Sequence, residues 1–181
     1  MIFTGDIALP FAESINIPII MYNVPSRTGL NINPQTAIQI GLENENIVGI
    51  KEASGNIDQV REIAKSKILD IYSGNDDQIY DVIKEGGIGV ISVFANLFPN
   101  EAHEIVYEYL NGNEETSRRM QKEALEVIKE LFNDVNPIPI KKAMELEGMC
   151  EGIIKEPLIE LDKNKTKRLI KAINDYKNRK A

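Results

Sequence analysis

The feature of this sequence that most restricts its fold is the alternation of short apolar runs with amphipathic segments. Apolar runs occupy residues 17–21, 47–50, 68–72 and 88–93, and segments with helical features lie between them and after the last. A strand followed by a helix and a further strand is typical of a parallel sheet with right-handed crossovers. The sequence therefore predicts an α/β fold with parallel strands.

Capping residues indicate where the helices between these strands begin. Asn33 is suited to cap a helix that begins at Pro34, because proline is favoured at the first helical position. Asn56 or Asp58 opens the next helix, and residues 75–77 (NDD) cap the third. We therefore expect one helix after each of the first three strands.

The remainder of the chain is predicted to be helical. Pro99 and Pro139 each begin a helix, and Asp162 caps the last one. The expected helices cover residues 99–110, 114–132, 139–146 and 162–176. Their charged residues are most simply explained as solvated faces.

The composition argues against several classes of partner. With 43% hydrophobic and 27% charged residues, the chain is ordinary for a globular protein. Its net charge of −7 argues against nucleic acid, because such binding needs a basic face. No apolar run reaches the roughly 20 residues that cross a bilayer, so no membrane partner is expected.

Four residues bear on localisation and metal binding. Asp6 and Pro10 interrupt the N-terminal apolar stretch, so no cleavable signal is expected. Cys150 is the single cysteine and cannot form an internal disulfide, which favours a cytoplasmic location. His103 is the single histidine and has no partner at metal-ligand spacing, so no metal is expected.

Lys51 is the leading candidate for chemistry. It ends the apolar run at residues 47–50 and is followed by the small residues 53–55 (ASG). The carboxyl ends of parallel strands carry the active sites of α/β enzymes. An amine held against apolar walls has a lowered pKa and can attack a carbonyl carbon. The alternative is a surface lysine that closes a strand.

A phenol and a guanidinium follow the neighbouring strand. Arg27 has a planar guanidinium that suits a carboxylate, and Tyr22 could transfer protons if partners orient it. Taken singly, Tyr22 is a strand-end aromatic and Arg27 a solvated loop charge. Together with Lys51, they describe a site that condenses a keto acid with a lysine.

Two motifs carry a family resemblance. Residues 22–29 (YNVPSRTG) and 49–55 (GIKEASG) closely resemble dihydrodipicolinate synthase (4-hydroxy-tetrahydrodipicolinate synthase), of the pyruvate-dependent class I aldolase superfamily. Residues 72–77, 86–96 and 136–141 agree with this family. N-acetylneuraminate lyase, a sister enzyme, shares the tyrosine and the lysine, whereas the SRT triplet of the first motif favours the synthase.

The resemblance implies a reaction and a set of site residues. Lys51 would form a Schiff base with pyruvate, and the enamine would add to aspartate semialdehyde, in lysine and diaminopimelate biosynthesis. This covalent imine needs no diffusible cofactor. Family members associate through their helices, so a homo-oligomer is expected. The implied site residues are Lys51 (Schiff base) and Tyr22 (proton relay), with Arg27, Thr28, Gly74 and Ile91 binding substrate.

The chain is short for the fold that the resemblance implies. A (β/α)8 TIM barrel takes about 250 residues, whereas this chain has 181. Residues 1–11 resemble the first strand of the family, and residues 12–16 resemble the end of a later helix. We therefore expect an internal deletion of strands two to four or, alternatively, an N-terminal truncation with an unrelated start.

The expected architecture is an incomplete (β/α)8 TIM barrel of about five parallel strands with C-terminal helices. Residues 1–97 would form the partial barrel, and residues 98–181 the last barrel helix and a C-terminal helical region, packed as one domain. The resemblance also implies that a threonine pair, a second tyrosine and the lysine-feedback site belong to the missing half.

Three functions are consistent with these expectations. The first is a synthase of the family whose catalysis is impaired by the shortening. The second is a catalytically inactive fragment, or a binding or interaction protein derived from the family. The third is a related pyruvate aldolase such as N-acetylneuraminate lyase.

Overall fold

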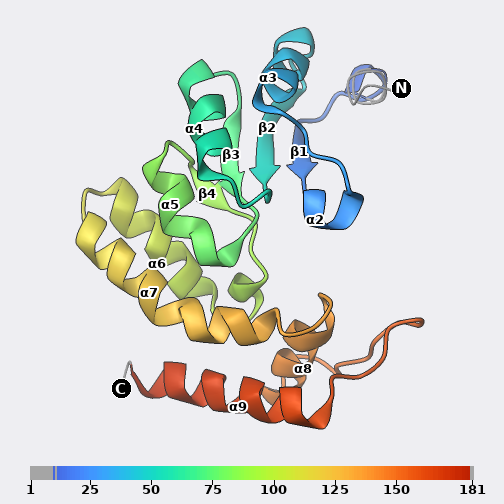
Figure 1. Ribbon diagram of the computed structural model, residues 1–181, viewed down its shortest axis with the longest axis vertical. Coiled ribbons are helices and arrows are strands. Elements are labelled where there is room, and N and C mark those ends of the chain that lie inside the picture. Colours follow the sequence, from blue (N-terminus) through green and yellow to red (C-terminus); the bar gives the residue numbers. More distant parts are fainter. Residues whose placement is uncertain (1–9, 11, 180–181) are drawn as a thin grey trace. The chain divides into compact units, whose positions relative to one another are not determined.

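The computed structural model describes residue 10 and residues 12–179 (Figure 1). These residues divide into two compact units, the first ending at Ile91 and the second beginning at Ser92. The strand expected within residues 1–11 lies almost wholly outside the described residues.

The first unit is built on a parallel sheet, as the alternating pattern predicts. Consecutive strands are neighbours, and Figure 1 shows β1 and β2 pointing the same way. The four described strands are β1 (Ile19–Asn23), β2 (Ile47–Glu52), β3 (Asp70–Ser73) and β4 (Gly89–Val90). A series of neighbouring parallel strands connected by helices is the wall of a (β/α) barrel, here incomplete.

Three helices pack on one face of this sheet. They are α3 (Pro34–Glu43), α4 (Ile57–Ser66) and α5 (Ile79–Lys84). Their apolar residues are spaced three or four apart, which places them on the side that faces the strands. The core that they form with the strands contains Met21, Ile47, Ile50 and Ile71 from the sheet and Ala37, Ile40, Val60, Ile63 and Val82 from the helices.

Two predicted helix starts differ in how they are capped. Asn56 caps α4, and its side-chain oxygen accepts hydrogen bonds from the backbone N–H groups of Asp58 (3.0 Å) and Gln59 (3.4 Å). Asn33 precedes α3 as predicted, but its side chain makes no capping bond and instead accepts from Asn31 Nδ2 at 3.3 Å. Proline at the first position of α3 removes one N–H that would need a cap.

Other boundaries depart from the sequence prediction. The short helix α2 (Pro25–Thr28) was not expected, and residues 75–77 lead into a 3₁₀ turn, η1 (Asp76–Gln78), before α5 begins. The predicted strand at residues 88–93 is only Gly89–Val90, because the chain bends after Ile91. The Ser92 hydroxyl there accepts a hydrogen bond from the N–H of Ala95 at 2.8 Å.

The second unit consists of helices close to those predicted. After the 3₁₀ turn η2 (Phe94–Asn96), they are α6 (Pro99–Leu110), α7 (Glu114–Leu131), α8 (Ile138–Leu146) and α9 (Lys163–Asn178). Phe94, Phe98 and Tyr176 meet in its core with ring centroids 5.0–5.8 Å apart. Burial raises the pKa of the Tyr176 phenol.

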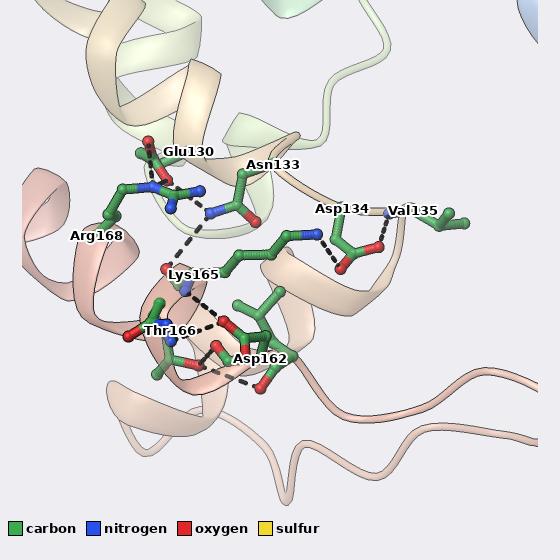
Figure 2. Close-up of polar contacts among 10 residues, drawn as sticks. Glu130, Asn133, Asp134, Val135, Asp162, Lys165, Thr166 and Arg168 are labelled. Carbon is green, nitrogen blue, oxygen red and sulfur yellow. Dashed lines mark hydrogen bonds and ion pairs between the residues drawn. The ribbon is translucent and has the colours of Figure 1, made fainter.

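Polar contacts join the end of α7 to the start of α9, as Figure 2 shows. The buried carboxylate of Glu130 accepts a hydrogen bond from Arg168 Nε at 3.3 Å, and Lys165 Nζ lies 2.7 Å from Asp134. Asp162 caps α9, and the backbone N–H groups of the first turn lower the pKa of its carboxyl. Among the described residues, no helix has both the length and the apolar character that a bilayer span requires.

Candidate active site

The strand register brings three chemically active side chains into one row. Tyr22 of β1 pairs with Lys51 of β2, which pairs with Tyr72 of β3. Successive strand residues point to opposite faces, and the residues before these three are buried under the helices. Tyr22, Lys51 and Tyr72 therefore lie on the face of the sheet that the helices leave open.

The amine of Lys51 lies against the ring of Tyr22. Its Nζ is 4.3 Å from the ring centroid, within the range of a cation–π contact. Partial burial lowers the pKa of Lys51, and the negative charge of the buried Asp76 opposes that shift. The net shift is downward, so a larger fraction of the amine is neutral than for a lysine in water. The neutral amine is the form that attacks a carbonyl.

Gly74 allows the end of β3 to approach Lys51. Its N–H donates a hydrogen bond to the backbone oxygen of Glu52 at 2.7 Å. A Cβ at residue 74 would lie 2.7 Å from the Cβ of Ala53 and 3.2 Å from Lys51 Cε, so a larger residue would displace these groups. Directly after β4, the N–H of Ile91 donates a hydrogen bond to the backbone oxygen of Ser73 at 2.9 Å, so Ile91 lies at the same edge of the sheet.

Arg27 and Thr28 lie in α2, next to the end of β1. Both side chains are exposed. The Thr28 hydroxyl lies 2.9 Å from the carbonyl oxygen of Leu30, to which it donates, and 3.2 Å from the Leu30 N–H. Gly29 ends α2 with φ of +70°, a left-handed conformation that favours glycine. The structure therefore groups Lys51, Tyr22 and Gly74, and it places Arg27 and Thr28 on an exposed short helix beside them.

A buried polar network at the same strand ends was not predicted from the sequence. Glu52 follows Lys51 and pairs with Asn23, which follows Tyr22. Asn23 Nδ2 lies 3.0 and 3.1 Å from the two Glu52 oxygens, and Gln59 Nε2 lies 2.8 Å from one of them. The sequence signal that could have revealed this network is the alternation of strand residues between the two faces, because it places residues 23 and 52 on the face covered by helices.

Metal ligands are not grouped in the part of the chain that the structure describes. No set of three or more His, Cys, Asp or Glu side chains there is arranged to hold a metal ion. His103 is exposed on α6 and stacks on Tyr107 with ring centroids 5.4 Å apart. Cys150 is exposed as well.

The fold and the site together define a class of protein. Neighbouring parallel strands with helices on one face, and an amine at their carboxyl edge, characterise a (β/α)-barrel protein, here with an incomplete barrel. A family model described as the dihydrodipicolinate synthetase family matches residues 10–176. The chain belongs to this family, and the resemblance drawn from the sequence motifs is confirmed.

Known relatives agree with this assignment. A 4-hydroxy-tetrahydrodipicolinate synthase, a lyase, from Caldicellulosiruptor saccharolyticus is 52% identical over 165 residues, which cover 91% of this chain and 56% of the relative. The crystal structure of dihydrodipicolinate synthase from Aquifex aeolicus is 34% identical with a TM-score of 0.92, over 96% of this chain and 60% of the other.

A third similar protein was solved with a small molecule. It is the chloride-inhibited dihydrodipicolinate synthase from Acinetobacter baumannii complexed with pyruvate, 30% identical with a TM-score of 0.89, over 93% of this chain and 58% of that one. This chain thus spans little more than half the length of the relatives that it matches.

Proposed function

We propose that this chain forms an imine between Lys51 and pyruvate and uses it in the condensation with aspartate semialdehyde. The observation that carries the proposal is the half-buried amine with a lowered pKa, held 4.3 Å from the Tyr22 ring at the carboxyl edge of the sheet. The pyruvate complex of the related Acinetobacter enzyme supports the keto acid as substrate.

The proposed chemistry uses the neutral amine first as a nucleophile. Lys51 Nζ adds to the keto carbon of pyruvate, and loss of water leaves an iminium. The methyl carbon then loses a proton to give an enamine, whose carbon bonds to the aldehyde carbon of the semialdehyde. The aldehyde oxygen takes up a proton to become a hydroxyl, and the iminium is restored. Attack by the amine of the semialdehyde on the iminium carbon closes the ring and releases Lys51. Because the iminium formed with Lys51 is the electron sink, no diffusible cofactor is required.

Neighbouring residues have supporting roles in this proposal. Tyr22 relays protons beside the amine, and Gly74 and Ile91 form the pocket wall at the ends of β3 and β4. Arg27 binds the semialdehyde carboxylate through its planar guanidinium, and Thr28 shapes the loop that presents it. For Arg27 this requires α2 to bring its exposed side chain toward the substrate.

We also propose that the short chain turns over more slowly than its full-length relatives. Transition-state stabilisation in an active site depends on donors that are already in place, and this chain corresponds to 56% of the length of a relative. We also propose that feedback inhibition by lysine is lost, because the resemblance places the lysine site in the missing half. The enzyme is proposed to be cytoplasmic and to act as a homo-oligomer, in which a second copy covers the open face of the sheet.

Product formation from pyruvate and aspartate semialdehyde tests the whole reaction. We expect slow product formation by the natural chain and none by Lys51→Arg, since a guanidinium cannot form the imine. Equal rates for the two would contradict the role of Lys51. A natural chain that forms no product at all would refute the condensation and favour an inactive fragment or a binding protein. Addition of lysine should leave the rate unchanged, and inhibition would contradict the loss of feedback.

A further inference from the structure

Two deeply buried acidic groups lie beside the proposed site, Asp76 and Glu52, and the carboxylate of Glu52 is held by a polar network. Its residue is 3% exposed, and its partners Asn23 and Gln59 are 1% and 6% exposed. Besides the amides of these two residues, the N–H of Ser54 donates to Glu52 Oε1 at 2.6 Å. An ionised carboxylate only accepts hydrogen bonds, so it suits a position surrounded by donors.

This network extends from the strand ends to the loop beyond α2. Asn23 Oδ1 accepts from the N–H of Ile32 at 2.9 Å, and Asn23 Nδ2 donates to Asn31 at 2.9 Å. Gln59 Nε2 also donates to the carbonyl of Ile32 at 3.1 Å. The network therefore connects β1, β2, α4 and the loop that follows Arg27.

Stability alone is a weak explanation for such a network. A buried charge carries a desolvation cost, and an apolar side chain of the same volume often stabilises a protein as well or better. The better-supported use of a buried polar group is to specify one arrangement among several. Here the arrangement concerns strand pairing, because Asn23 and Glu52 are directly paired.

The residues that the network fixes lie next to the reactive ones. The Asn23–Glu52 pair comes one residue after the Tyr22–Lys51 pair on the same two strands. Because side chains alternate between faces, holding one pair under the helices holds the preceding pair on the open face. The N–H of Ser54 further ties the turn that follows Lys51 to the same carboxylate.

We infer that Glu52, held by Asn23 and Gln59, is a positioning residue that keeps the Lys51 amine against Tyr22 for imine formation. This inference rests on the proposed function for its catalytic consequence. Its geometric part, the contact between Lys51 and Tyr22, can be measured without any reaction.

Glu52→Gln is the test variant, with Glu45→Gln as its matched control. The change keeps the shape but replaces one accepting oxygen with an NH₂ donor that faces other donors. Glu45 is an exposed carboxylate in the turn before β2, so the same change there leaves the network intact. Two quantities are compared: the rate at which borohydride traps pyruvate on Lys51, and the nuclear Overhauser effect between the Lys51 side chain and the Tyr22 ring.

We expect Glu52→Gln to lose the Lys51–Tyr22 contact and to trap pyruvate on the order of ten- to a hundredfold more slowly, since small misplacements have effects of that size. The melting temperature and circular dichroism identify a variant that still folds. Should Glu52→Gln not fold, Gln59→Met is the second variant, because it removes one hydrogen-bond donor and leaves the Glu52 carboxylate in place. We expect Gln59→Met to weaken the Lys51–Tyr22 contact and the trapping of pyruvate by a smaller amount.

Two outcomes separate this inference from the proposed function. If a folded Glu52→Gln keeps the Lys51–Tyr22 contact and the trapping rate of the natural chain, the positioning role is overturned. If the natural chain traps no pyruvate, the proposed function fails, and the contact alone decides the positioning role. Loss of the contact in Glu52→Gln but not in Glu45→Gln then supports it.

Discussion

The amine of Lys51 is subject to two opposing influences. Burial against the sheet lowers its pKa, and the carboxylate of Asp76 raises it. The first effect is the larger, so the neutral nucleophile is present at lower pH than for a lysine in water. The open face of the sheet thus carries an amine suited to attack a carbonyl, 4.3 Å from the centroid of the Tyr22 ring.

Asp76→Asn should lower the pKa of Lys51 further, because it removes the charge that favours the ammonium form. The fraction of neutral amine rises as the pH passes its pKa, so the pH profile of Lys51 acylation or imine trapping should move to lower pH. Asp77→Asn is the matched control, since Asp77 is the exposed neighbour in the same turn. A profile that moves to higher pH in Asp76→Asn would show that the assigned influence has the wrong sign.

Helix starts show what local sequence can and cannot specify. The sequence offers Asn56 or Asp58 as the start of α4, and Asn56 caps it through two backbone N–H groups. Asn33 has the same side chain and the same position before a helix, but its oxygen is taken by Asn31. This contact spans only two residues, but Asn31 is itself hydrogen-bonded to Asn23 and Gln59, and no local pattern contains the bond to Gln59.

Asn56→Ala should lower the free energy of unfolding by about 1 kcal/mol, the usual cost of losing such a cap. Chemical denaturation followed by circular dichroism measures this difference. Asn56→Asp should have a much smaller effect, because aspartate also accepts bonds from the first turn and suits the helix dipole. Equal losses for alanine and aspartate would indicate that Asn56 acts by some means other than capping.

The site was predictable to the extent that it depends on strand ends. Lys51 and Tyr22 each close an apolar run, and parallel pairing then makes them neighbours. Glu52 was not found in advance, because its partners come from another strand and from α4. A buried acid in a strand is recognisable only once the face that the helices cover is known.

The molecule as a whole combines a parallel α/β unit and a helical unit, and its match covers little more than half the length of its relatives. On the described sheet, β1 pairs with β2 alone. Ile20, which is 41% exposed, lies two residues before Tyr22 and so on the same open face. An exposed apolar side chain beside a strand edge favours association with another chain.

We therefore expect the purified protein to form an assembly of more than one chain in solution. Ile20→Lys should shift this association equilibrium toward single chains. Sedimentation velocity over a range of concentrations measures this. Leu42→Lys, a substitution at an exposed position of α3, is the control and should leave the association unchanged. A natural chain that sediments as a single copy at every concentration would exclude this mode of association.

Borohydride reduction in the presence of pyruvate, followed by peptide mass spectrometry, tests the central claim most directly. The account predicts a stable pyruvate adduct on the peptide that contains Lys51, and none when pyruvate is omitted or when Lys51 is replaced by arginine. A folded chain that gives no adduct, or gives adducts only on other lysines, would contradict it.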